Sequence, residues 1–476
     1  MSPSEPATDG ALPSVPAPGD LTVRVNAFSG DLAKTEGTFA PTWRRWALGE
    51  EAGAHEPSML APEEEPILTR WQDPRVGWGV VLPLDLEEAD VPAPIRRLIA
   101  SRQTDLGRVP VLRPFPKDDP NALILLKDLD ANNAPTIDGS GLGVAIGSIP
   151  AYLLIVGSPE EISWELQEVL SQSGRFVGRL DLGETGLKRY IDHLLHDWSG
   201  SSARLDQTVT WAVRHNADDI TATLRSVLTR PLHKKLAGDS DIGTGAVFLD
   251  GKESEVTGSD LRDALADQRP LLVATSSHGQ TAPLDDRDTL RRDLGLPVGQ
   301  DLELLDVADL LSHWQPDGAV WFCHACCSAG CKAESAYRDL FPTDGPIAEV
   351  LDGVAGLGNV TAPLPRALLG AEKPLRAFIG QVEPTFDWTL KQPETGQKLA
   401  TTLIKPLYER LYLKKPVGMT LADWHRRSAS LNDAWIKMRQ DIRDGGTPTT
   451  AMLYPRLAAA DVASTVLLGD PTAFFA

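Results

Sequence analysis

Cysteine is scarce in this sequence and is confined to one place. The 476 residues include four cysteines, and all four lie between Cys323 and Cys331. Cysteines gathered in one short segment cannot cross-link distant parts of a chain, which excludes a framework of disulfides. The pattern is typical of a reducing compartment, and we expect a cytoplasmic protein.

Long apolar runs and positive charge are also lacking. No uninterrupted apolar stretch approaches the roughly 20 residues of a membrane-spanning helix. The first twenty residues have neither the basic start nor the apolar centre of a signal peptide. Lys and Arg number 46 against 66 Asp and Glu, which gives a net charge of −20. Because such a surface repels phosphate backbones and anionic lipids, we expect neither nucleic-acid nor membrane binding.

The composition that is present suffices for packed cores. Hydrophobic residues make up 42% of the chain, which includes twelve Trp. At about 150 residues per domain, the length predicts roughly three domains. We expect a disordered tail (residues 1–20), a mixed N-terminal domain (21–118), a non-catalytic α/β subdomain (119–245) and a catalytic domain (246–476).

Apolar strands alternate with helices from residue 151 onwards. Residues 152–156 form a continuous apolar run, typical of a strand covered on both faces. Ser158, Pro159 and Glu161 then carry the pattern of a helix N-terminus. Further strands are predicted at 175–180, 271–275, 319–322 and 375–380, further helices at 259–266, 304–314, 332–340, 398–412 and 421–443, and a helical connector at 206–236. This alternation predicts an α/β fold with a mostly parallel sheet flanked by helices.

Two of these strands end in residues that can do chemistry. His278 and Gly279 follow the strand at 271–275, and the cysteines follow the strand at 319–322. Since functional groups gather at the carboxyl ends of parallel strands, we expect His278 and Cys326 to meet although 48 residues separate them. A histidine about 50 residues before a cysteine is the layout of caspase-type peptidases.

The chemistry of such a pair is specific. A thiolate is the attacking species in cysteine catalysis, and an imidazole makes it available. Cys326 is expected between a strand and a helix, where amide groups and the helix dipole favour an anion. Gly279 allows a close approach of the backbone, and the N–H groups of Gly279 and Cys326 are candidate oxyanion donors.

The residues around this pair resemble the caspase-like clan of cysteine peptidases (clan CD). Residues 275–279 and 324–330 are similar to its two motifs and look most like bacterial CHAT and gingipain-type members. Residues 153–162 and 176–180 resemble the non-catalytic first half of gingipain-type enzymes, and 378–383 resemble the strand that follows the nucleophile. The resemblance covers residues 150–440 or so.

This resemblance implies a cysteine endopeptidase without a cofactor. Cys326 would be the nucleophile, His278 the proton shuttle and Gly279 part of the oxyanion hole. Cys327 stays an alternative nucleophile, because the family usually has another residue there. The implied partners are a protein substrate, with Arg or Lys before the cleaved bond, and a regulatory protein that releases a latent state. Bacterial relatives of this kind point to a defence or conflict system.

Three other interpretations of the cysteines stay open. They could bind zinc together with His324, although structural zinc sites normally use two separated ligand pairs. Cys323 and Cys326 have the C-x-x-C spacing of a redox motif. Finally, the cysteines could be core residues of a catalytically silent caspase-like interaction module, since free cysteine is often buried.

Overall fold

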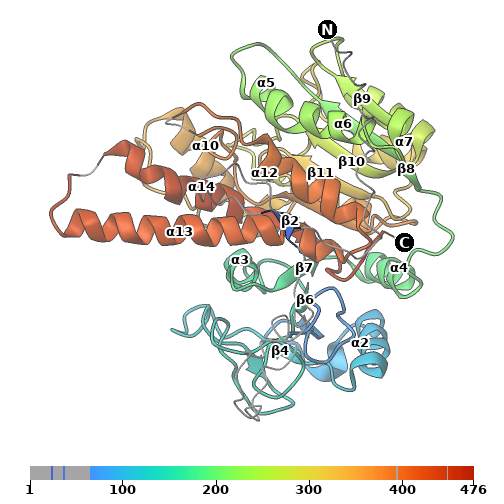
Figure 1. Cartoon of the computed structure of the whole chain (residues 1–476), viewed down its shortest axis with the longest axis vertical. Coiled ribbons are helices and arrows are strands. Elements are labelled where there is room, and N and C mark those ends of the chain that lie inside the picture. Colours follow the sequence, from blue (N-terminus) through green and yellow to red (C-terminus); the bar gives the residue numbers. More distant parts are fainter. Residues whose placement is uncertain (1–22, 25–35, 38–64, 393–394, 448, 476) are drawn as a thin grey trace, which may run out of the picture. The chain divides into compact units, whose positions relative to one another are not determined.

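The computed structural model describes residues 23–24, 36–37, 65–392, 395–447 and 449–475 (Figure 1). The chain divides into two units, Met1–Glu65 and Pro66–Ala476. In the first unit, strand β1 (Val23–Arg24) pairs with antiparallel β2 (Glu36–Gly37). The disordered tail predicted at 1–20 lies outside the described residues.

An eleven-stranded sheet forms the centre of the second unit (Figure 1). Its strands, in spatial order, are β5 (Lys127–Asp128), β4 (Val111–Arg113), β3 (Trp78–Val81), β6 (Tyr152–Val156), β7 (Phe176–Leu180), β15 (Thr465–Leu468), β14 (Ala377–Gln381), β11 (Val320–His324), β10 (Pro270–Ser276), β8 (Arg204–Ala212) and β9 (Ala246–Asp250). Neighbours are parallel except at β5/β4 and β15/β14. The predicted α/β class with a large, mostly parallel sheet is confirmed.

The antiparallel pair β15/β14 divides the sheet into two parts. Strands β14, β11, β10, β8 and β9 run in one direction, and β15, β7, β6, β3 and β4 run in the other. The carboxyl ends of β8, β10, β11 and β14 therefore share one edge of the sheet. Residues that follow these strands can meet there, whatever their separation in sequence.

Helices flank the sheet (Figure 1). They are α2 (Ala93–Leu106), α3 (Trp164–Gln172), α4 (Glu184–Leu195), α5 (Ile220–Leu224), α6 (Arg230–Ala237), α7 (Gly258–Gln268), α8 (Arg287–Asp293), α9 (Val307–His313), α10 (Pro346–Ala355), α11 (Pro363–Leu369), α12 (Ala400–Lys405), α13 (Ala422–Arg443) and α14 (Tyr454–Ala463). Short 3₁₀ or π segments and a small hairpin complete the unit: η1 (Glu88–Asp90), η2 (Arg225–Thr229), η3 (Gly243–Gly245), η4 (Pro406–Arg410), η5 (Val417–Leu421), η6 (Thr450–Leu453), β12 (Gly330–Cys331) and β13 (Val360–Thr361).

The apolar strands are buried on both faces. In β6, Leu154 packs into one hydrophobic cluster while Leu153 and Ile155 pack into another on the opposite face. Successive residues of a strand point to opposite faces, so a strand covered by helices on both sides needs apolar residues at every position. This is why residues 152–156 could be recognised as a strand.

Three local predictions were wrong. The helix expected at Ser158 begins at Trp164 with Ser163 as N-cap, and Ser158 and Glu161 instead close a turn through reciprocal hydrogen bonds. The predicted connector at 206–236 contains β8, whose buried Thr208 and Thr210 interrupt the apolar run that marks the other inner strands. The helix expected at 332–340 is a series of turns.

Candidate active site

His278 and Cys326 occupy matching places on neighbouring strands. Ser276 on β10 pairs with His324 on β11, and each candidate residue lies two positions further on. The Ser277 N–H donates to the His324 carbonyl at 3.3 Å, which extends the pairing past the strand ends. The two segments therefore leave the sheet side by side at its carboxyl edge.

Gly279 packs directly against the backbone of Cys326. A Cβ atom at position 279 would lie 2.9 Å from the Cys326 nitrogen and would collide with the Cys326 carbonyl oxygen. Within the described parts of the chain, neither the Gly279 N–H nor the Cys326 N–H donates to a protein acceptor. Two unpaired amide donors on adjoining segments are suited to holding an oxyanion.

Asp219 holds the His278 ring. It is the N-cap of α5, and its Oδ1 accepts the Thr221 N–H at 2.8 Å and the Thr221 hydroxyl at 2.5 Å. Its Oδ2 lies 3.0 Å from His278 Nε2. Burial works to raise the pKa of Asp219, but the hydrogen bonds from Thr221 and His278 together lower it. A carboxylate at Nε2 favours a proton there and leaves Nδ1 as the acceptor.

A second imidazole, that of His215, covers His278. The rings are stacked with centroids 5.3 Å apart and an interplanar angle of 14°. Burial, followed by the neighbouring His278, lowers the pKa of His215, and Asp219 opposes this effect. Because a neutral ring adds no positive charge, Asp219 is left to interact with His278.

The two adjacent thiols have different surroundings. Cys327 is fully buried, and its backbone adopts the left-handed region with φ 55°. Its side chain packs in an apolar cluster with Leu290, Leu294, Cys331, Val354, Leu357 and Val360. Cys326 is partly exposed, while Cys323 and Cys331 are buried. Cys326 is thus the least buried of the four cysteines.

Thr385 covers the sulfur of Cys326. The Thr385 N–H donates to Sγ at 3.3 Å, and the Thr385 hydroxyl and carbonyl oxygens lie at 3.7 and 3.9 Å. Burial raises the pKa of Cys326, and the contacts with Thr385 reduce this effect without reversing it. No helix begins after Cys326, so the dipole expected to lower this pKa is missing. In this state the thiol is neutral near pH 7.

The segment that carries Thr385 is fixed by a buried carboxyl group. Asp461 Oδ2 accepts the Thr389 hydroxyl at 2.6 Å, and Oδ1 accepts the Phe386 N–H at 3.4 Å. The rings of Phe386 and Trp388 stack with centroids 4.2 Å apart. The cover over the thiol is therefore an ordered part of the fold.

Comparison with known proteins gives a weak structural likeness. No protein-family model matches the chain, and no curated protein matches it. The chain is similar to a solved crystal structure of the Saccharomyces cerevisiae separase–securin complex, with 12% sequence identity and a TM-score of 0.35. The match covers 70% of this chain and 16% of that chain. The resemblance to CHAT and gingipain-type proteins stays a prediction.

Two kinds of feature are absent from the described residues. No group of three or more His, Cys, Asp or Glu side chains there is arranged to hold a metal ion. No helix in the same part of the chain has the length and apolar character to span a bilayer.

Sequence reasoning missed Asp219, His215 and Thr385. Asp219 and His215 follow β8, whose residues the sequence pattern predicts as part of a helical connector, so the sequence does not place either residue at the sheet edge. The order Asp219-Ile220-Thr221 is a helix N-cap pattern and could have been noticed. Thr385 lies in a loop without any motif, and only tertiary contacts bring it to the thiol.

Proposed function

We propose that this protein is a cysteine peptidase that uses Cys326, His278 and Asp219. The observation that supports the proposal is the register of β10 and β11, which brings Gly279 against the Cys326 backbone, while Asp219 binds Nε2 of the adjoining His278. A nucleophile, a base and a group that orients the base form the usual arrangement of covalent catalysis.

The proposed reaction begins with a proton transfer. Nδ1 of His278 accepts the Cys326 proton, and the thiolate attacks the carbonyl carbon of the peptide bond. The oxyanion receives hydrogen bonds from the N–H groups of Gly279 and Cys326. The imidazolium, stabilised by Asp219, then protonates the leaving amine. Water, deprotonated by His278, hydrolyses the thioester and restores the thiol.

The covered thiol supports a latent resting state. Thr385 occupies the position next to the sulfur, and burial raises the thiol pKa. A substrate or a regulatory protein partner has to displace the Thr385 segment before attack. We propose a protein substrate with Arg or Lys before the cleaved bond, which the chain's net charge of −20 supports. The proposed cytoplasmic place rests on the confinement of all four cysteines to one segment, and the proposed role in bacterial defence rests on the family resemblance.

The same cover favours a second candidate function, a catalytically silent interaction module. Incubation of the full chain with a peptide library separates the two. The peptidase proposal expects cleavage after basic residues, and expects Cys326→Ala or His278→Ala to lower the rate by about a thousandfold or more. Cys327→Ala is the matched control and should stay within severalfold of the wild type. Equal rates in all variants, or no cleavage after the Thr385 segment is loosened by Asp461→Ala, would contradict peptidase function.

A further inference from the structure

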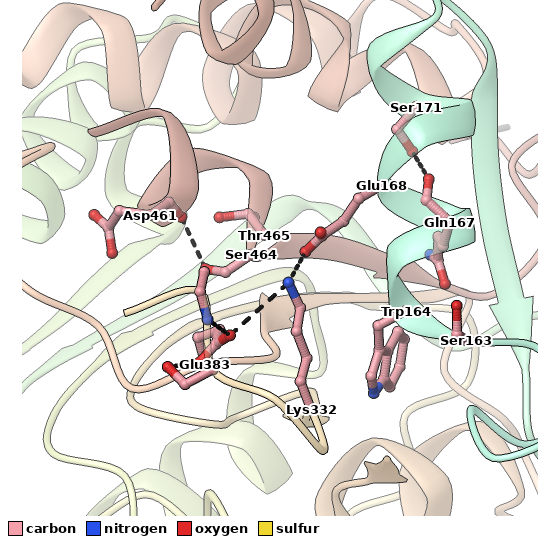
Figure 2. A network of polar contacts seen from close by, with 12 residues as sticks. Ser163, Trp164, Gln167, Glu168, Ser171, Lys332, Glu383, Asp461, Ser464 and Thr465 are labelled. Carbon is pink, nitrogen blue, oxygen red and sulfur yellow. Dashed lines mark hydrogen bonds and ion pairs between the residues drawn. The ribbon is translucent and has the colours of Figure 1, made fainter. Parts of the chain in front are cut away.

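Lys332, which directly follows Cys331, carries a buried charge close to the nucleophile segment. Its side chain is 6% exposed. Nζ lies 2.5 Å from Glu168 Oε1 on α3 and 3.9 Å from Glu383 Oε1 in the segment after β14 (Figure 2). Moving an ammonium and two carboxyl groups out of water costs several kcal/mol per ion.

The contact between Lys332 and Glu168 connects the chain after the cysteines to the part of the sheet that contains β6 and β7. Helix α3 belongs with β6 and β7, which bear none of the proposed catalytic residues. Besides Glu168, it contributes Trp164, whose Nε1–H donates to the Cys331 carbonyl at 3.0 Å. Figure 2 shows Trp164 and Glu168 on the same helix, with Lys332 extending toward Glu168. Helix α3 therefore holds the chain directly after the cysteine cluster by two polar contacts.

The contact between Lys332 and Glu383 connects Lys332 to the segment that covers Cys326 Sγ. The Glu383 carboxylate accepts the Ala336 N–H at 2.9 Å and the Ser335 hydroxyl at 3.0 Å. The backbone carbonyl oxygen of Glu383 accepts the Cys327 N–H at 3.1 Å. Two residues further on, Thr385 donates to Cys326 Sγ. A shift of Glu383 would thus displace both the amide next to the nucleophile and the residue that covers it.

We propose that Lys332 is a positioning residue for Cys326, through which α3 controls the geometry and the cover of the thiol. Its importance for turnover rests on the proposed peptidase function, whereas its hold on the thiol does not. Burial raises the pKa of both Glu168 and Glu383, and the Lys332 charge opposes this rise. The ammonium thus favours the ionised form of Glu383, which accepts two hydrogen bonds from residues 335 and 336.

The test measures the rate at which iodoacetamide alkylates Cys326 in the full chain across pH, with peptide mapping to identify the site. Lys332→Met should raise this rate by about fivefold or more, because local opening of the 383–385 segment uncovers the sulfur. Lys332→Arg keeps the positive charge, so Cys326 should be alkylated at close to the wild-type rate in this variant. Arg108→Met is the matched control, since Arg108 pairs with buried Asp128 on β5 at the far edge of the sheet.

A second variant guards against loss of folding. In Glu168→Gln/Lys332→Met the buried charge on α3 is removed together with its partner, so stability should recover while alkylation stays fast. A wild-type alkylation rate in a folded variant that lacks Lys332, or loss of fold in both variants, would overturn the proposal. Fast alkylation in a chain that cleaves no peptide would instead refute only the peptidase function. In an active chain, kcat should fall more than KM changes.

Discussion

At the scale of single residues, Asp219 decides what His278 can do. The carboxylate fixes the ring through Nε2, and in doing so it directs the basic nitrogen away from α5. Sequence reasoning singled out His278 and Cys326 but not this third residue. Its role can be separated from that of its neighbour Asp218, which is exposed.

We expect Asp219→Asn to lower kcat by about a hundredfold to ten-thousandfold with little change in KM, because the amide favours the wrong tautomer and does not stabilise the imidazolium. The measurement is steady-state kinetics on a cleaved peptide, which separates kcat from KM. Asp218→Asn should behave like the wild type. Equal losses in both variants would show that Asp219 is only a helix cap.

Asp461 makes stability depend on pH. Burial raises its pKa from the ordinary 3.8 to about 7. Between these values the folded protein holds a proton that the unfolded chain releases, so stability falls as pH rises from about 4 to 7 and then levels off. Asp461→Asn should lack this contribution and gain stability relative to the wild type between pH 5 and pH 8.

Urea unfolding at pH 5 and pH 8 checks this expectation. Asp433→Asn is a suitable control, because Asp433 is exposed on α13. The pH dependence of the control should match that of the wild type. If the stability of Asp461→Asn changes with pH as it does in the wild type and the control, the carboxyl of Asp461 is not the group responsible.

At the scale of elements, the site depends on how closely the segments after β10 and β11 approach. Gly279 permits this approach because a side chain there would collide with the Cys326 backbone. We expect Gly279→Ala to cost about 1–3 kcal/mol of unfolding free energy, since overpacking forces the backbone apart. The variant should also lose activity, because the two amide donors separate.

The control for this change is Gly183→Ala at the N-cap of α4, where an added Cβ meets no atom within 4 Å. Chemical denaturation together with the peptidase assay gives both readings. Normal stability and activity in Gly279→Ala would mean that the two segments are further apart than the structure has them.

At the scale of the whole unit, β15 joins the two oppositely directed parts of the sheet. Leu467 lies on this strand, is 1% exposed and pairs with Ile379 of β14. Leu467→Ala should cost about 2–5 kcal/mol through lost burial and a residual cavity. Because one sheet contains both parts, tryptophan fluorescence and Cys326 alkylation should report the same shifted urea midpoint.

Leu413→Ala, at a side chain that is 54% exposed, should change stability by no more than about 0.5 kcal/mol. Two separate transitions in Leu467→Ala, one for each part of the sheet, would show that the parts fold independently. A single shared transition would agree with the proposal that α3, which packs with β6 and β7, influences the site.

The sequence by itself determined the α/β class and the places of the inner strands. Strands β6, β10, β11 and β14 lie where their apolar runs predict, because a strand buried on both faces must be apolar throughout. Strand β8 was missed, because its threonines satisfy the ladder without continuous apolar character. The residues at the ends of β10 and β11 could be singled out, because His and Cys are residue types that commonly act in catalysis.

Only the tertiary structure decided what surrounds those residues. It set Cys327 in an apolar cluster and left Cys326 partly exposed, since a left-handed backbone at position 327 directs that side chain inward. It replaced the helix expected at 332–340 by turns, because Lys332 and the 335–336 segment bind Glu383 across the fold. Such contacts join residues tens to hundreds of positions apart, and local pattern carries no information about them.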